Sequence, residues 1–173
     1  MLKRISEVSL IVLSLSQMTV AANTPQIDQL LNKNECAGCN LSQANLYSLK
    51  LEGANLQKAT LTQAGLQGST LDFANLQGAI ADRANFALVT LQSANLENAN
   101  LQSANFYGAD LRNANLTGAN LQGASLEGAD LRGAILKSAN LQKANLVRSK
   151  MLGANLEGAV LKGARMPDGG EAK

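Results

Sequence analysis

Cys36 and Cys39 form the one Cys-x-x-Cys motif of this 173-residue chain, and several chemistries use such a pair. Covalent haem attachment needs a histidine directly after the second cysteine, but Asn40 stands there and the chain has no histidine. A zinc ion needs four ligands, so two more thiolates would have to come from a second chain. A thioredoxin-like redox motif lies in a βαβ context that this sequence lacks. A structural disulfide is the simplest use in an exported protein, and the redox and metal alternatives stay open.

The residues before the cysteines predict a short helix. Thr24 is a suitable N-cap, and the proline after it suits the first helical position. Ile27, Leu30 and Leu31 fall on one side of such a helix. We therefore expect residues 23–38 to form a capping helix with a Cys-x-x-Cys junction, held by the disulfide.

A five-residue period follows, from Cys39 to Asp168, which is 130 residues or 26 repeats. The central position is Leu in 21 repeats, and the residue two positions earlier, the alanine position, is Ala in 21. The polar position between them is Asn or Asp in 15 repeats, and Gly ends 11 repeats. The departures at the alanine position are Cys39, Leu49, Ser69, Val89 and Ser149.

This period excludes regular helices and straight strands. Five residues advance about 500° around an α-helix, so the leucines would form no stripe. In a straight strand, the alanine of the next repeat would point to the opposite face from the leucine before it. The chain must therefore turn once per repeat, between the Leu and the next Ala, and glycine tolerates the positive φ that tight turns often require.

A chain that turns in this way and keeps Leu and Ala inside winds into a solenoid. The A-N-L-x-x repeat, as at residues 94–98, resembles that of the pentapeptide-repeat family. The resemblance implies an all-β solenoid, a right-handed quadrilateral β-helix with four repeats per coil. The chain would then make about 6.5 coils, in a rod roughly 31 Å long. Some exported cyanobacterial members are similar in having an N-terminal helix and a Cys-x-x-Cys before the first repeat.

Residues 20 apart are then expected to lie one coil above another. Phe86 and Phe106 would stack in adjacent layers, which we interpret as core packing. Ala81 lacks the volume of a leucine, and we expect Phe86 to fill that space. Outward polar residues would form two ladders, one of charges and one of amides: Asp110, Arg112, Asp130 and Arg132, and Asn100, Asn120 and Asn140.

The first 22 residues have the layout of a secretory signal. Lys3 and Arg4 precede an apolar stretch from Val8 to Leu15, and small residues lead to Ala22. The stretch is too short for a transmembrane helix. We predict a signal peptide over 1–22 and export to the periplasm or the thylakoid lumen; a disordered cytoplasmic N-terminus is the alternative.

Charge is unevenly distributed along a chain whose formal net charge is +2. Between Arg132 and Arg165, Glu157 is the single acidic residue among seven basic ones. We predict a basic binding end there, suited to an acidic protein or, more weakly, an anionic membrane surface. Its residues are Arg132, Lys137, Lys143, Arg148, Lys150, Lys162 and Arg165.

Catalysis is not expected. The chain has no histidine, the inward positions are apolar, and no Gly-rich phosphate loop precedes a helix. We therefore predict no catalytic residue, cofactor or metal.

The leading interpretation is a non-catalytic exported solenoid that acts as a rigid protein-binding module or structural spacer. Its domain would be the β-helix of residues 39–168, followed by a polar tail at 169–173. The expected partner is another protein and not a nucleic acid, with a monomer or a dimer formed through an uncapped C-terminal coil. The alternative is a DNA-mimicking modulator of a type II topoisomerase, as some members of the family are. That role needs a strongly acidic rod, which the near-neutral charge disfavours.

Overall fold

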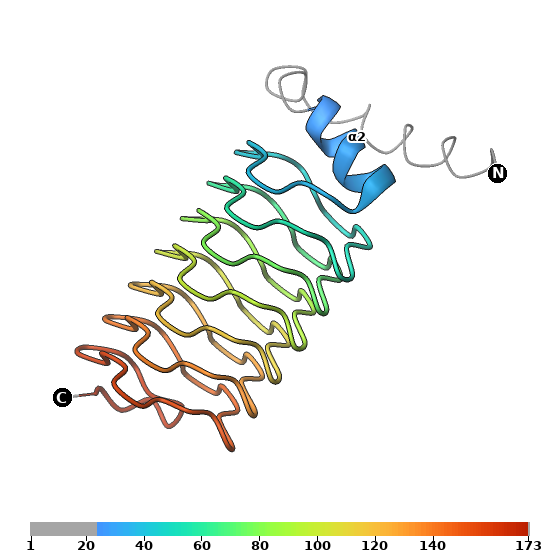
Figure 1. Cartoon of the computed structure of the whole chain (residues 1–173). Helices are drawn as coiled ribbons and strands as arrows, with labels where there is room; N and C mark the ends of the chain where they lie inside the picture. Colours follow the sequence, from blue (N-terminus) through green and yellow to red (C-terminus); the bar gives the residue numbers. More distant parts are fainter. Residues whose placement is uncertain (1–23, 173) are drawn as a thin grey trace.

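The structure is a computed structural model that describes residues 24–172 (Figure 1). The helix α2 (Thr24–Lys33) is followed by a rod of stacked coils that reaches the C-terminus. Within the described part of the chain, no helix is long and apolar enough to cross a membrane. The predicted signal peptide, residues 1–22, lies outside the described residues.

The coils are joined by single parallel bridges between residues 20 apart. Asn95 pairs with Asn115 and Asn100 with Asn120, and the same register continues from Glu35 to Arg165. Twenty residues are four repeats, so each coil has four sides of one repeat each. We call a set of residues 20 apart a column. Strands longer than one bridge do not form, because a turn interrupts every side after a few residues.

The backbone of each repeat forms the same set of hydrogen bonds to the coils on either side. In one example, the Leu101 N–H donates to Asn120 of the next coil at 2.8 Å, and the Asn100 N–H donates to Ala79 of the preceding coil at 2.8 Å. The turn closes when the Ala104 N–H donates to the Leu101 carbonyl at 3.1 Å. The turn therefore lies between the central residue and the next alanine position, where the five-residue period predicts it.

The last residue of every repeat from Gln43 to Gly163 has a positive φ, as in type II turns. Glycine adopts this conformation freely, and Gly118 has φ 66°. Other repeats place larger residues there, including Phe73 with φ 60° and Leu88 with φ 58°. The stacked coils therefore determine the turn conformation. Glycine lowers the free-energy cost of the positive φ, but the turn forms without it.

The first coil begins one repeat earlier than the sequence pattern indicates. Glu35 already forms a bridge with Asn55, and the Cys36 N–H donates to the Asn55 carbonyl at 2.7 Å. Cys36 therefore occupies a central position, one repeat before the start at Cys39 that the sequence pattern predicts. The repeat is hidden in the sequence because it carries neither the alanine nor the leucine of the others.

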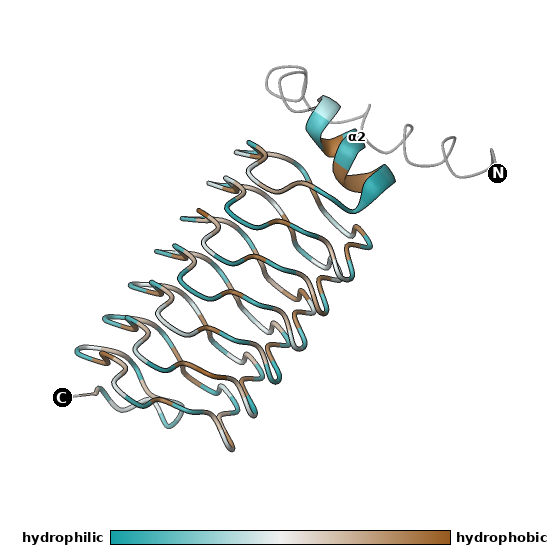
Figure 2. Ribbon diagram, in the orientation of Figure 1, coloured by the Kyte–Doolittle hydropathy of each residue, from teal (hydrophilic) through white to brown (hydrophobic). Residues whose placement is uncertain are grey.

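The helix α2 lies across the first coil, with brown apolar and teal polar surfaces on its turns (Figure 2). Leu30 is completely buried in the core, and Ile27 and Leu31 are partly buried against it. Asn34 follows the last residue of the helix. Its φ of 58° and its N–H bond to the Leu30 carbonyl at 2.9 Å form a left-handed C-terminal cap.

The C-terminal segment that we expected to be a polar tail folds back onto the rod. Glu171 forms an antiparallel bridge with Arg165, and the Ala172 N–H donates to the Ala164 carbonyl at 2.8 Å. Gly169 has φ 87°, a conformation that allows the chain to reverse. One side of the last coil is therefore covered.

Candidate interaction surface

The two cysteines are joined as a disulfide in the first corner of the rod. Cys36 takes a central position and Cys39 the next alanine position, with their Cα atoms 5.2 Å apart. Both side chains belong to the buried core. The bond thus replaces a Leu–Ala contact at the coil that α2 covers. Among residues 24–172, no three His, Cys, Asp or Glu side chains gather to hold a metal.

The asparagines of the polar position are committed to the backbone. The Asn95 Oδ1 accepts the N–H of Glu97 at 3.1 Å, and the same contact recurs in many repeats. This N–H has no partner in an adjacent coil, so the side chain replaces one. The expected amide ladder is also present: Asn140 donates to Asn120 at 3.2 Å and Asn120 to Asn100 at 3.4 Å. These amides hold the wall and are not a ligand site.

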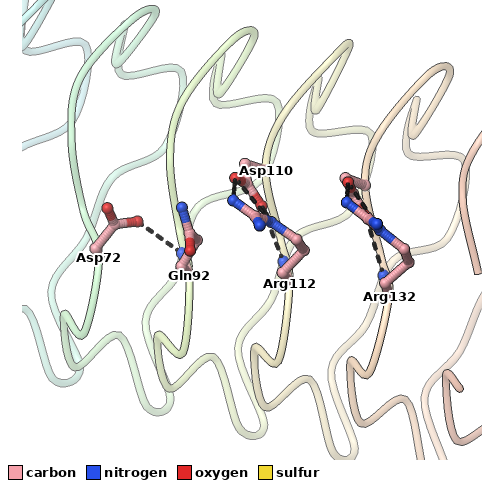
Figure 3. Close-up of polar contacts among 6 residues, drawn as sticks. Asp72, Gln92, Asp110, Arg112 and Arg132 are labelled. Carbon is pink, nitrogen blue, oxygen red and sulfur yellow. Dashed lines mark hydrogen bonds and ion pairs between the residues drawn. The ribbon is translucent and has the colours of Figure 1, made fainter.

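Thr90 interrupts this arrangement, and an aspartate compensates. With threonine at the polar position, the N–H of Gln92 is accepted by Asp72 of the preceding coil at 2.7 Å (Figure 3). Further along the same wall, Asp110 accepts the backbone N–H of Arg112 at 3.2 Å and pairs with its guanidinium at 2.7 Å. The charge ladder is therefore made of pairs within one repeat.

The paired arginines change the acidity of these aspartates. The hydrogen bond from the Arg112 guanidinium holds the pKa of Asp110 below its ordinary value, and Arg132 does the same to the pKa of Asp130. In return, the pKa of each arginine is raised. A group with a lowered folded pKa stabilises the fold above its unfolded pKa, and that contribution is lost as the pH falls through the folded value.

We expect Asp110→Asn to cost less than about 1 kcal/mol at pH 7, because it removes an exposed ion pair but keeps an acceptor for the Arg112 N–H. Asp110→Ala should cost about 1 kcal/mol more, since it also removes that acceptor. Urea unfolding at pH 7 and pH 3 tests both. The difference between wild type and Asp110→Asn should shrink below about pH 4. Equal costs for the two variants at pH 7 would contradict the backbone role.

The two phenylalanines pack in the core. Phe86 and Phe106 are completely buried, with parallel rings whose centroids are 4.8 Å apart. That distance equals the usual spacing between paired strands. Ala81, one repeat before Phe86 in the same coil, is also completely buried. Nothing in this cluster faces solvent, so it stabilises the rod and offers no binding site.

Ser69 has a structural role that the sequence analysis missed. Its hydroxyl accepts the Leu49 N–H at 2.9 Å and donates to the Leu46 carbonyl at 2.6 Å. In a regular turn those two backbone groups bond each other, so Ser69 bridges a turn that the larger Leu49 holds open. The sequence did contain a signal for this role, because four of the five departures from alanine fall in one column. They are Leu49, Ser69, Val89 and Ser149.

The seven residues of the predicted basic end surround the rod instead of forming one patch. Their repeats lie on all four sides of the rod, so every side carries at least one of them. Three are paired: Arg132 with Asp130 at 2.6 Å, Lys137 with Glu157 at 3.1 Å, and Arg148 with Glu127. Within residues 24–172, four have no ion pair: Lys143, Lys150, Lys162 and Arg165.

Two exposed apolar residues, Leu88 and Tyr107, lie on the same side of the rod in adjacent coils. Leu88 and Tyr107 are 63% and 53% exposed. The end of the Leu88 side chain lies over Gly108, 2.9 Å from the point where a Cβ would stand. The other large exposed apolar residues are spread over the rod. Scattered residues of this kind are normal on protein surfaces.

The last coil differs from those before it in its backbone. In the preceding coil, the Leu136 N–H donates to Asn155 at 2.7 Å and the Leu141 N–H to Val160 at 2.8 Å. In the last coil, the corresponding N–H groups have no partner among residues 24–172: Met151, Gly153, Leu156, Gly158 and Leu161. Its central residues are partly exposed, whereas those one coil earlier are completely buried.

Comparison with known families agrees with this geometry. A model described as pentapeptide repeats matches eight copies, in segments that together span residues 39–168. The chain belongs to the pentapeptide-repeat family. Solved members of that family fold as right-handed quadrilateral β-helices, which is the fold class of this protein. No curated protein matches the sequence.

Three solved pentapeptide-repeat structures illustrate the likeness. Rfr23 from the cyanobacterium Cyanothece 51142 is 32% identical, covering 86% of this chain and 97% of that one, with a TM-score of 0.34. A protein from the thylakoid lumen of Arabidopsis thaliana is 31% identical over 56% of this chain and 69% of that one, with a TM-score of 0.53. QnrB1, a plasmid-mediated fluoroquinolone resistance protein, is 19% identical over 76% and 67%, with a TM-score of 0.58. That identity supports the fold alone.

Proposed function

We propose that this pentapeptide-repeat protein is a non-catalytic, exported binding module that presents a rigid rod to another protein. The observation that carries the proposal is the use of its polar groups. The inward residues are packed Leu and Ala, and the asparagines of the walls bond to their own backbone. The coil-to-coil N–H groups that have no partner among residues 24–172 lie at the two ends of the rod, as at Asn40 and Asn45 in the first coil and Met151 and Leu156 in the last. A rod whose coils bond to one another along its length, and whose last coil keeps free N–H groups, is suited to binding there or to acting as a spacer.

Export is supported by two features of different kinds. The first is the signal-like layout of residues 1–22, and the second is the disulfide between Cys36 and Cys39. Disulfides persist in oxidising compartments and are rare in reducing ones. The relative from the Arabidopsis thylakoid lumen supports that compartment, and the periplasm has the same redox character.

DNA mimicry is the less favoured alternative. A rod that replaces a duplex must reproduce its dense negative charge, about one charge per 1.7 Å of helix axis. This chain has a net charge of +2, which is opposite in sign to that of a duplex. The likeness to QnrB1 does not favour it either, because 19% identity supports only the fold.

Intact-mass measurement of the protein from its native cells tests export directly. We expect a species that begins near Asn23 and does not react with an alkylating reagent until it is reduced. A full-length species that is fully alkylated without reduction would refute export and the disulfide together. Crosslinking in the compartment so identified should then capture another protein, and capture of topoisomerase from the cytoplasm would favour the alternative.

A further inference from the structure

The two ends of the rod differ in how completely their apolar interiors are covered. The central residues of the first coil, which α2 covers, are completely buried, whereas those of the last coil are partly exposed. The first set is Leu41, Leu46 and Leu51, and the second is Met151, Leu156 and Leu161. The helix α2 is therefore what keeps solvent from the interior of the first coil (Figure 1).

The docking of α2 depends on apolar packing with little polar support. Leu30 is completely buried, but among residues 24–172 no side chain of α2 forms a hydrogen bond or an ion pair with a coil. The side-chain oxygen of Gln26, Oε1, is buried without a hydrogen-bond partner in the same part of the chain, which weakens the docked state. An isolated helix of 10 residues is at best marginally stable, so α2 would lose its helical structure once it left the rod.

The disulfide lies directly beneath this helix. The Cys36 sulfur is 3.4 Å from the Gln26 carbonyl oxygen, and both cysteines belong to the buried core. Because the bond joins residues only three apart in sequence, it constrains the unfolded chain little, and its effect on the fold is local. The disulfide therefore acts mainly on the corner of the first coil and on the helix that covers it.

Reduction would disturb the contact between this corner and α2. Two thiol sulfurs that are not bonded must lie further apart than the two sulfurs of a disulfide, and a close-packed interior has no spare room for them. The corner itself is held by its backbone, since the Cys36 N–H donates to the Asn55 carbonyl at 2.7 Å. The reduced Cys36 thiol is only a weak hydrogen-bond donor to the Gln26 oxygen. The neighbour that yields is therefore α2.

We propose that the Cys36–Cys39 disulfide is a redox-sensitive switch, and that a dithiol reductant releases α2 and opens the first coil. One thiolate of the reductant attacks the Cys39 sulfur, because Cys39 is 7% exposed and Cys36 is completely buried, and Cys36 leaves as a thiolate. The second thiolate then attacks the reductant's own sulfur in the mixed disulfide and releases Cys39. The protein gains two electrons and two protons, and the reductant becomes a disulfide. This inference goes beyond the proposed function, since it concerns the opposite end of the rod.

Amide hydrogen exchange of the purified protein, with and without dithiothreitol, tests the switch. We expect complete reduction, checked by intact mass, to speed exchange in residues 27–33 at least tenfold. It should also allow an apolar dye such as anilinonaphthalene sulfonate to bind, because the interior of the first coil becomes accessible. Exchange in the coils beyond residue 75 should stay unchanged.

The matched control is the double variant Cys36→Leu with Cys39→Ala, which restores the usual residues at both positions of the repeat. Its α2 should stay protected with or without dithiothreitol. Leu30→Ala removes the buried anchor of the helix and should expose α2 without reduction.

Three results would overturn the switch. They are unchanged exchange in α2 after complete reduction, loss of protection along the whole rod, and the same response to dithiothreitol in the double variant. Each of them would leave the proposed binding module intact, because the measurement tests neither export nor binding to a partner.

Discussion

Truncation of Phe86 to alanine should lower the free energy of unfolding by about 3–5 kcal/mol, the largest effect that we expect from any single substitution discussed for this protein. Phe86 is completely buried, stacks on Phe106 and lies beside the small Ala81. With alanine at position 86, the core of this coil would lack the volume of a phenylalanine side chain in addition to the leucine volume that is already missing at Ala81. Urea unfolding followed by circular dichroism measures the loss.

A double-mutant cycle at these positions shows whether Phe86 fills the space beside Ala81. Ala81→Leu alone should be destabilising by about 1–3 kcal/mol, because the space is already used. Phe86→Leu alone should also be destabilising. The double variant restores the usual leucine at both positions, and it should be more stable than the sum of the two losses implies. A raised melting temperature for Ala81→Leu alone would show that the space is empty and refute this packing.

Substitution of Ser69 by alanine should lower the free energy of unfolding by about 2 kcal/mol. The hydroxyl bridges the Leu49 N–H and the Leu46 carbonyl, and its removal leaves two backbone groups without partners. Alanine is the usual residue at this position of the repeat, so a consensus argument predicts the opposite sign. Thermal or urea unfolding decides between them.

Ser149 provides the matched control in the same column. Its side chain is almost completely buried, and within residues 24–172 its hydroxyl has no hydrogen-bond partner. Ser149→Ala should therefore raise the free energy of unfolding by about 1 kcal/mol, because it removes an unsatisfied polar group. Changes of the same sign at Ser69 and Ser149 would mean that the bridge contributes nothing.

The period of five was sufficient to predict a solenoid that turns in every repeat, whereas four repeats per coil and the right-handed twist were implied by the resemblance to the family. Leu and Ala can share one interior only if the chain turns in every repeat, and this argument needs no detail of any side chain. The turn at Phe73 illustrates its strength, since a bulky residue adopts a positive φ there. Neighbouring coils determine that conformation, so departures from glycine did not weaken the prediction.

The candidate site was harder to predict because it depends on contacts outside the period. Cys36 hides the first repeat, since a disulfide replaces the usual apolar contact. The basic residues were predicted as an end of the rod, but their pairing with carboxylates in the same or a neighbouring coil depends on side-chain reach. The tail at Glu171 pairs antiparallel to the rod, a geometry that no repeat of the sequence encodes.

The 20-residue register also governs how such a chain can change in length. Insertion of one repeat preserves every local turn, yet it rotates everything beyond it by a quarter turn and takes Ser69 out of line with Leu49 if it falls between them. Only a whole coil of four repeats lengthens the rod and leaves each side chain above its former neighbour. Duplication of 20 residues therefore leaves every side chain on its own side of the rod. A five-residue duplication between Tyr107 and Lys150 instead moves Lys150 to a different side relative to Leu88 and Tyr107.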